Sequence, residues 1–145
     1  MKNNRVFNYE LASKGDRLFA AITQGVLLFI LLIIVYKFIG IPIAAIFSSD
    51  TDLIDILISI LQGLFLGAIF YPFFTGNLGH KIFGLKVISA ETGEDYKKAD
   101  EGAIRECLKN LLGYLIIPNI WILWDKKNQN LYDKLTNTYV VKRFD

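Results

Sequence analysis

Cysteine and histidine are nearly absent from the chain: Cys107 and His80 are the single examples of each among 145 residues. One cysteine excludes a disulfide framework. One of each excludes a cysteine/histidine metal cluster or catalytic pair, unless a second chain supplies the missing half. No other nucleophile stands in a recognisable arrangement with a base. We therefore expect no enzymatic activity, no cofactor and no bound metal.

Charge is missing from two long stretches. No charged residue lies between Arg17 and Lys37, and none lies between Asp55 and His80, in a chain that is 53% hydrophobic. Each stretch meets the requirement of about 20 apolar residues for a helix that crosses a bilayer. The sequence therefore predicts an integral membrane protein, a single domain over residues 1–145, with transmembrane helices at about 18–39 and 53–74.

The ends of the first span carry helix signals. Ser13 and Asp16 offer side chains that cap a helix N-terminus, and Gly40 and Pro42 stop the helix. The apolar run exceeds the roughly 7–15 residues of a signal-peptide core, which favours an uncleaved anchor. An acidic loop that contains Asp50 and Asp52 follows it.

A third apolar segment, at about residues 101–124, has the spacing of an amphipathic helix. Its apolar positions are Ile104, Cys107, Leu108, Leu111, Leu112 and Leu115. Its polar positions are Arg105, Glu106, Lys109 and Asn110. Pro118 interrupts the segment, and Trp121 and Trp124 suit the headgroup level of a membrane. The segment is predicted to be interfacial or re-entrant, and a full third crossing is the alternative.

The positions of the basic residues favour an interfacial or re-entrant third segment over a full third crossing. Every lysine and arginine except Lys37 lies before the first span, in the middle loop, or in or after the third segment. Positive charge gathers on the cytoplasmic side, so both termini and the middle loop are predicted to be cytoplasmic. A third crossing would move the basic C-terminal segment, residues 125–145, outside. The net charge of +2 is too small for a nucleic-acid-binding surface, so no nucleic-acid partner is expected.

Two short segments have β character. Residues 85–90 end at a turn signal, and residues 138–142 are β-branched and aromatic. If they pair, both lie on one face of the membrane, because an open strand cannot satisfy its backbone in lipid. The predicted fold class is an all-α membrane protein with a small two-stranded cytoplasmic β pairing.

Small residues recur at every fourth position of the second span. The helix-packing set is Ser59, Gln62, Gly63 and Gly67. Such a row lets another helix approach closely, and the Gln62 amide can bond across the contact. Gln24 and Gly25 on the first span are the expected partners. The alternative is ordinary lipid-facing glycine.

Arg17 stands where the first span enters the membrane. Its guanidinium either reaches up to the headgroups or finds a carboxylate, for which Asp125 and Asp133 are the candidates. A bidentate pair would fasten the C-terminal segment to the first span. With Gln24, these residues form the predicted functional polar cluster, which would act as a structural clamp or as a gate.

A glycine-rich loop follows the second span. Its motif residues are Gly76, Gly79, Lys81 and Gly84. A phosphate-binding loop needs four residues between its glycines and a Ser or Thr after the lysine, whereas this loop has two and Ile82. A glycine-permitted turn is therefore favoured over a phosphate cradle. His80 is expected at the surface.

Three blocks together resemble the RDD family of small bacterial membrane proteins. They are KGDRLFAA at residues 14–21, GNLGHKIFGLKV at residues 76–87 and NLYDKLTNTYVV at residues 130–141. The family is named for one arginine and two aspartates. The resemblance implies that Arg17 is the arginine and Asp133 the later aspartate. Gln24, a neutral amide, stands where the first aspartate is expected.

The resemblance implies a multi-pass protein of the bacterial inner membrane, and some family members are linked to cation/proton antiport. From the sequence we expect a non-enzymatic component that binds a membrane protein partner or forms a homo-oligomer in the lipid bilayer. The alternative is a cation/proton antiporter, or other small-solute transporter with a cation ligand. Because two spans make a poor channel alone, that alternative also needs an oligomer.

Overall fold

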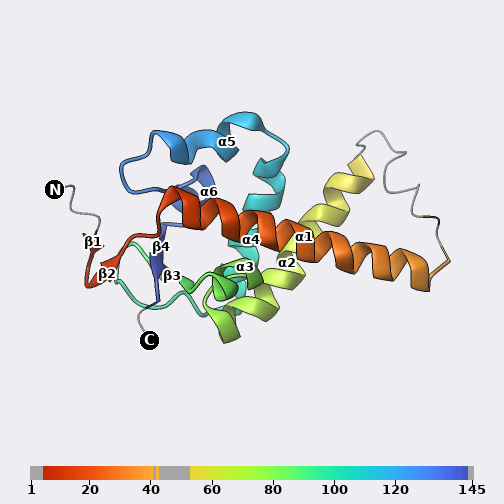
Figure 1. Ribbon diagram of the computed structural model, residues 1–145, viewed down its shortest axis with the longest axis horizontal. Coiled ribbons are helices and arrows are strands. Elements are labelled where there is room, and N and C mark those ends of the chain that lie inside the picture. The colour runs from red at the N-terminus through yellow and green to blue at the C-terminus, as the bar shows by residue number, and fades with distance from the viewer. Residues whose placement is uncertain (1–4, 41, 43–52, 144–145) are drawn as a thin grey trace.

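The computed structural model describes residues 5–40, 42 and 53–143. Its helices are α1 (Lys14–Phe38), α2 (Leu53–Phe74), α3 (Leu78–Ile82), α4 (Ala99–Gly113), α5 (Ile116–Ile120), the 3-10 helix η2 (Trp121–Leu123) and α6 (Leu131–Leu135). Its strands are β1 (Arg5–Val6), β2 (Tyr9–Glu10), β3 (Leu85–Ser89) and β4 (Thr138–Lys142). The strands lie at one end of the molecule, and the free ends of α1 and α2 project at the other (Figure 1). The predicted acidic loop, with Asp50 and Asp52, falls outside the described residues.

The two long helices agree with the predicted spans. α1 begins with a capping box, in which Ser13 Oγ accepts from the Asp16 backbone N–H at 3.0 Å and Asp16 accepts from the Ser13 backbone N–H at 3.1 Å. It ends before Gly40, whose φ is +77°. Residues Lys14–Phe38 and Asp55–Ile82 are each apolar and long enough to cross a membrane.

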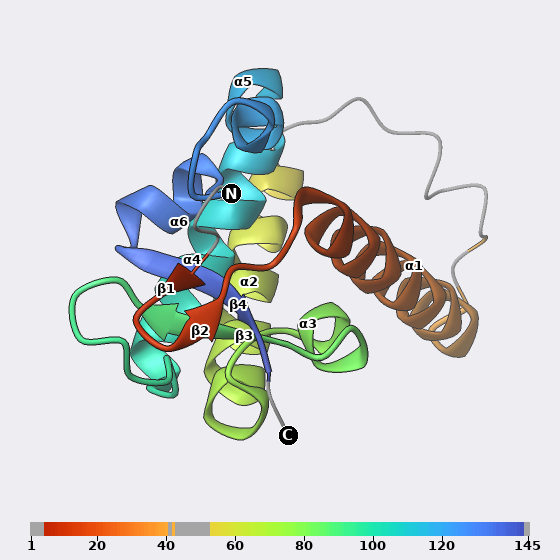
Figure 2. The ribbon, with the colours of Figure 1, turned by 60° about the vertical axis from the view of Figure 1, so that its left-hand side comes forward.

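The small-residue row of α2 does admit a second helix, but that helix is α4. A Cβ on Gly67 would lie 2.3 Å from the Gly102 carbonyl oxygen, and a Cβ on Gly63 would lie 2.9 Å from Cys107 Cα. Figure 2 shows α2 and α4 side by side, with α1 inclined away from them. The predicted contact with Gln24 and Gly25 was therefore wrong.

The amide that bonds across the α2–α4 contact also differs from the expected one. Asn110 Nδ2 donates to the Ser59 carbonyl at 2.8 Å. Gln62 is exposed. A helical repeat shows which positions share a face, but the neighbour that covers this face is fixed only by the path of the chain.

α4 is amphipathic, but its faces are turned opposite to those of an interfacial helix. Such a helix presents its charged side to water, whereas α4 buries Arg105 and Glu106 and exposes Ile104 and Leu111. The inward turn is possible because the two charged side chains find partners on α2 and α6. The amphipathic spacing of α4 was predicted correctly, but the sequence did not show that its charged face is the buried one.

Residues 101–124 do not form one helix broken at Pro118. α4 ends at Gly113 and α5 starts at Ile116, so the break precedes Pro118, which lies inside α5. α4 runs antiparallel to α2, from Gly102 beside Tyr71 to Asn110 beside Ser59. The chain then returns to the start of α1, where Lys14 Nζ donates to the Leu123 carbonyl.

The predicted strand pairing is present. β3 and β4 are antiparallel, with Val87 opposite Val140. A second hairpin, β1 with β2, escaped prediction because strands of two residues carry no periodicity. Leu11 bridges to Val141, which joins the segment before α1 to β4. The buried strand residues and Tyr71 form the core at this end of the molecule.

Candidate functional site

Buried ionisable side chains from four helices meet where α1 begins. The arginine–aspartate cluster consists of Arg17 from α1, Tyr71 from α2, Arg105 and Glu106 from α4, and Asp133 from α6. Each of these residues is at most 5% exposed. Charges so deeply buried are tolerated only when they are paired and hydrogen-bonded. The arginine–aspartate cluster is therefore the candidate site. Its ion pairs and hydrogen bonds bear on whether it acts as a structural clamp or as a gate.

Asp133 lies at the centre of the cluster because it contacts both arginines. Its Oδ2 lies 2.6 Å from Arg17 Nη2, and its Oδ1 accepts from Arg105 Nη2. The first turn of α6 fixes the carboxylate, since Oδ2 also accepts from the Asn130 backbone N–H at 2.8 Å. Burial would raise the pKa of Asp133, but the charges of Arg17 and Arg105 outweigh it and hold that pKa below its ordinary value.

Arg17 has a carboxylate partner, Asp133, which was one of the two predicted candidates. Its Nη1 donates to the Asn128 carbonyl at 2.6 Å, and its Nη2 donates to the Tyr132 hydroxyl at 3.3 Å as well as to Asp133. The guanidinium contacts one carboxylate oxygen, so the pair is not bidentate. Arg17 fastens the start of α1 to the segment that leads into α6.

Asp125, the other predicted partner, lies outside the cluster. Its Oδ2 lies 2.6 Å from Lys134 Nζ. Its Oδ1 accepts from the backbone N–H groups of Lys127 at 2.9 Å and Gln129 at 3.0 Å. Burial raises the pKa of Asp125, but these bonds outweigh it and lower the pKa. The residue holds the turn before α6.

Sequence reasoning missed Arg105. Its guanidinium donates to Asp133, to the Tyr71 hydroxyl and, through Nε, to Thr138 Oγ1 at 3.3 Å. An arginine on the polar side of an amphipathic pattern is normally assigned to water. The available signal was Gly102, which precedes Arg105 by three positions and Glu106 by four, because a small residue on that face permits close helix contact.

Glu106 supplies the second buried negative charge. Its Oε1 accepts from the Tyr71 hydroxyl at 3.0 Å and from Asn77 Nδ2 at 3.4 Å, and its Oε2 lies 3.1 Å from Lys109 Nζ. Burial would raise the pKa of Glu106, but the charges of Lys109 and Arg105 outweigh it and hold that pKa below its ordinary value. The cluster thus keeps both carboxylates ionised near neutral pH and links α2, α4 and α6.

Comparison with known proteins bears on this arrangement. Residues 11–137 match the model of the RDD family, and this range includes every member of the cluster. The chain belongs to the RDD family. No curated protein and no solved structure matches it. The expected family is therefore confirmed, and the two residues that the resemblance assigned, Arg17 and Asp133, are in direct contact.

In this RDD protein Gln24 is separate from the cluster. The side chain is buried, and its Oε1 accepts from the Gly79 backbone N–H at 3.2 Å. Gly79 itself touches α1, because a Cβ there would lie 2.0 Å from the Ala20 carbonyl oxygen. Gln24 and Gly79 thus attach α3 to α1, and the predicted grouping of Gln24 with Arg17 and Asp133 is not present.

The glycine-rich loop of the RDD protein forms turns and close contacts. Gly76 and Gly84 adopt φ values of +154° and +60°, and Asn77 caps α3 by accepting from the His80 backbone N–H at 3.0 Å. Lys81 is exposed. His80 is only 6% exposed, so its expected surface position was wrong. The loop buries His80 because Gly76 leaves room for the ring, whose Nδ1 lies 2.8 Å from the position of an added Cβ.

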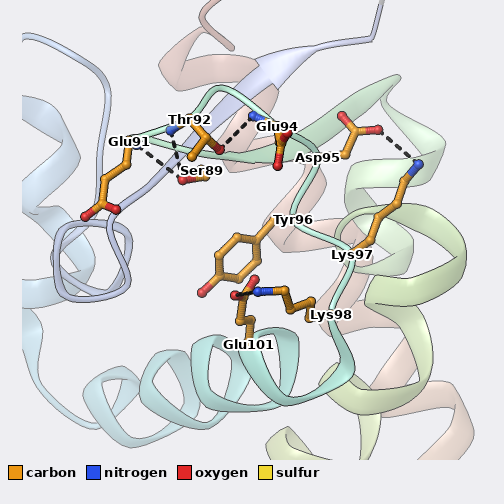
Figure 3. A pocket seen from close by; sticks show the side chains of 9 residues that line it. All are labelled: Ser89, Glu91, Thr92, Glu94, Asp95, Tyr96, Lys97, Lys98 and Glu101. Atoms are coloured by element: carbon orange, nitrogen blue, oxygen red, sulfur yellow. Dashed lines mark hydrogen bonds and ion pairs between the residues drawn. The ribbon is translucent and has the colours of Figure 1, made fainter.

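A polar hollow of about 270 Å³ lies between the loop that follows β3 and the start of α4 (Figure 3). Its lysines pair with carboxylates, with 2.9 Å between Lys98 and Glu101 and 3.3 Å between Lys97 and Asp95. None of the predicted site residues lines it. Within the described ranges, no group of three acidic, histidine or cysteine residues could hold a metal ion.

Proposed function

We propose that this RDD protein is a non-enzymatic component of the bacterial inner membrane that binds another membrane protein or a second copy of itself. The observation that carries the proposal is Gln62. Its amide lies near the middle of α2, is exposed, and makes no hydrogen bond within the described part of the chain. An unpaired amide in hydrocarbon is costly, and a helix from a partner relieves that cost.

The position of α1 supports the same proposal. The buried residues of α1 are Arg17, Ala20 and Gln24, all in its N-terminal half, and none of residues 30–38 is buried. Gly25 has no atom within 4 Å of an added Cβ. The two long helices diverge (Figure 2), so apolar surface on both remains open to lipid or to a further helix.

The pairing within the cluster favours a clamp over a gate. Arg17, Arg105, Asp133 and Glu106 neutralise one another in fixed bonds. No Asp, Glu, His, Lys or Arg lies between Arg17 and Lys37 or between Asp55 and His80, so neither span carries a carboxylate or imidazole proton acceptor at its centre. One cysteine and one histidine also give little basis for enzymatic catalysis.

We further propose that α4 through η2 is re-entrant and that both termini are cytoplasmic. The segment descends beside α2 and returns to Lys14, which supports re-entry over an in-plane helix or a full crossing. The contact of Leu11 with Val141 and the pairing of β3 with β4 keep the N-terminal segment, the middle loop and β4 together. Their basic residues favour the cytoplasmic side.

Energy transfer between donor-labelled and acceptor-labelled copies of the full chain in liposomes tests self-association. We expect transfer above that of a non-interacting membrane protein at equal density. Gln62→Leu should reduce it, whereas Gln62→Asn, which keeps the amide, and Leu61→Ile on the neighbouring exposed position should not. If wild type shows no transfer, a photo-crosslinker at Leu61 in native membranes should give a specific adduct that Gln62→Leu abolishes. Absence of both would overturn the proposal.

Cation/proton antiport is the second candidate because ionisable side chains buried beside membrane helices often mark ion pathways. It predicts exchange in proteoliposomes that Asp133→Asn abolishes while the protein stays folded. The clamp predicts no exchange above that of empty liposomes, for wild type and variant alike. Exchange by the wild type would replace the partner-binding proposal with transport.

A further inference from the structure

A hollow of about 240 Å³ opens beside the start of α1, between α1, α4, η2 and α6. Its polar wall includes Lys14, Arg17, Lys109 and Tyr132, and its apolar rim includes Leu18 and Ile122. It is distinct from the bonds inside the arginine–aspartate cluster, which lies behind it and shares only Arg17. A basic wall with an apolar rim suits a ligand that has both an anionic group and an apolar part.

The wall is positively charged. Three of its lining residues are cationic and none is acidic. Arg17 and Lys109 have carboxylate partners, Asp133 and Glu106. Lys14 pairs with no carboxylate in the described residues; its ammonium donates to the Leu123 carbonyl and keeps two further hydrogens. The hollow therefore offers at least one uncompensated cation to an anionic ligand.

Tyr132 supplies a buried donor that points to a ligand. Its hydroxyl oxygen accepts from Arg17 Nη2 at 3.3 Å and from Asn130 Nδ2 at 2.8 Å. No acceptor for the hydroxyl hydrogen is seen in the described ranges, although the residue is only 9% exposed and lines the hollow. A buried O–H group normally has an acceptor, so an oxygen of a bound anion completes its bonding.

The position of the hollow selects the source of that anion. The uncharged run of α1 starts at Leu18, which is 59% exposed, so the hollow lies where headgroups meet hydrocarbon. Trp124, which is 56% exposed, follows the lining residue Ile122 by two positions, as expected at that level. Basic pockets between membrane helices bind anionic lipid headgroups, and the apolar rim suits the first carbons of acyl chains.

We propose that this hollow binds the phosphate of an anionic phospholipid headgroup, with Lys14, Lys109 and the Tyr132 hydroxyl as donors. The site does not depend on partner binding or on transport. It places one lipid against the joint between α1 and the C-terminal segment that Arg17 and Asp133 fasten. Occupancy would therefore stabilise that joint.

The two tryptophans of the chain, Trp121 and Trp124, flank Ile122 and report on the site. The full chain in phosphatidylcholine vesicles is titrated with brominated phosphatidylglycerol or with brominated phosphatidylcholine, whose bromines quench indole fluorescence. We expect phosphatidylglycerol to be preferred by about tenfold or more, since each lysine near the headgroups contributes roughly fivefold. Equal quenching by the two lipids would overturn the proposal.

Matched variants separate the site from general attraction to a charged membrane. Lys14→Gln with Lys109→Gln should abolish the preference, and the two Lys→Arg changes should keep it. Lys81→Gln with Lys126→Gln removes the same charge from exposed positions outside the hollow and should also keep it. If this control loses as much preference as the test variant, the attraction is non-specific and the site is refuted.

Two further measurements keep the test decisive. Lys14→Gln alone removes only a bond to a backbone carbonyl, so it should stay folded and still lose most of the preference; an unchanged preference would contradict the proposal. Inorganic phosphate at about 10 mM should not displace the brominated phosphatidylglycerol. Displacement would show that the hollow takes a soluble phosphate instead of a lipid.

Discussion

Asp133 Oδ2 lies 2.6 Å from Arg17 Nη2, although 116 positions separate the two residues in the sequence. The contact joins the first turn of α1 to the first turn of α6. Arg105 binds the other oxygen of the same carboxylate, so one aspartate faces two buried guanidinium groups. The Asp133 carboxylate is therefore a counterion that Arg17 and Arg105 share.

Asp133→Asn should destabilise the protein by about 3–5 kcal/mol, because it leaves two buried arginines without their shared counterion. Thermal unfolding in detergent micelles, followed by circular dichroism, measures the loss. Glu101→Gln is the control, since it breaks the exposed ion pair with Lys98 and should cost less than about 1 kcal/mol. Equal effects of the two changes would mean that the cluster does not hold the joint.

Acid should weaken the fold through the same carboxylates. The pKa values of Asp133 and Glu106 are lowered in the folded state, so their stabilisation is complete above the pKa of the unfolded chain and is lost as pH falls through the folded pKa. We expect steady stability from about pH 7 to pH 5 and a decline below about pH 4. The decline should be smaller in Asp133→Asn. If stability falls with pH equally in the variant and in the wild type, Asp133 does not contribute to the acid sensitivity.

Gly67→Ala should separate α2 from α4. The new Cβ would lie 2.3 Å from a backbone oxygen of Gly102, which cannot move aside as a side chain does. We expect a loss of about 1–3 kcal/mol in the free energy of unfolding. Gly25→Ala on α1 is the matched control: nothing lies within 4 Å, so the higher helix propensity of alanine should leave stability unchanged or improved. A neutral Gly67→Ala would place the helix contact elsewhere.

Gln24→Leu and Gln62→Leu should differ in their effects on stability. The first leaves the buried Gly79 N–H without its acceptor and should cost about 1–3 kcal/mol. The second removes an exposed amide that bonds to nothing in the described chain and should leave monomer stability unchanged. Unfolding in detergent at low protein concentration compares them. A neutral Gln24→Leu would show that α3 is held to α1 by packing alone.

Local features of this protein were predicted because their signals are local. The second span, residues 53–74, coincides with α2, and the Ser13 capping box starts α1. Hydropathy depends on composition within one window, and capping depends on residues three positions apart. The pairing of β3 with β4 was also predicted, from the turn signal that ends residues 85–90 and from the β-branched and aromatic residues at 138–142.

The choice of partners was beyond local signals. From the sequence, Asp125 and Asp133 were both candidate partners of Arg17. In the structure the partner is Asp133, because Lys134 and two backbone N–H groups bind Asp125. The sequence also suggested that α1 packs against the glycines of α2, but in the structure α4 does.

The sequence by itself determined two helices that are long and apolar enough to cross a membrane, an amphipathic third segment and membership of the RDD family. Only the tertiary structure decided which face of α4 is buried and that Arg105 shares Asp133 with Arg17. The physical reason is that amphipathic spacing shows that a helix has a polar and an apolar face, but does not show which face packs against the rest of the protein. A buried charge needs a counterion, and that counterion comes from a distant part of the chain.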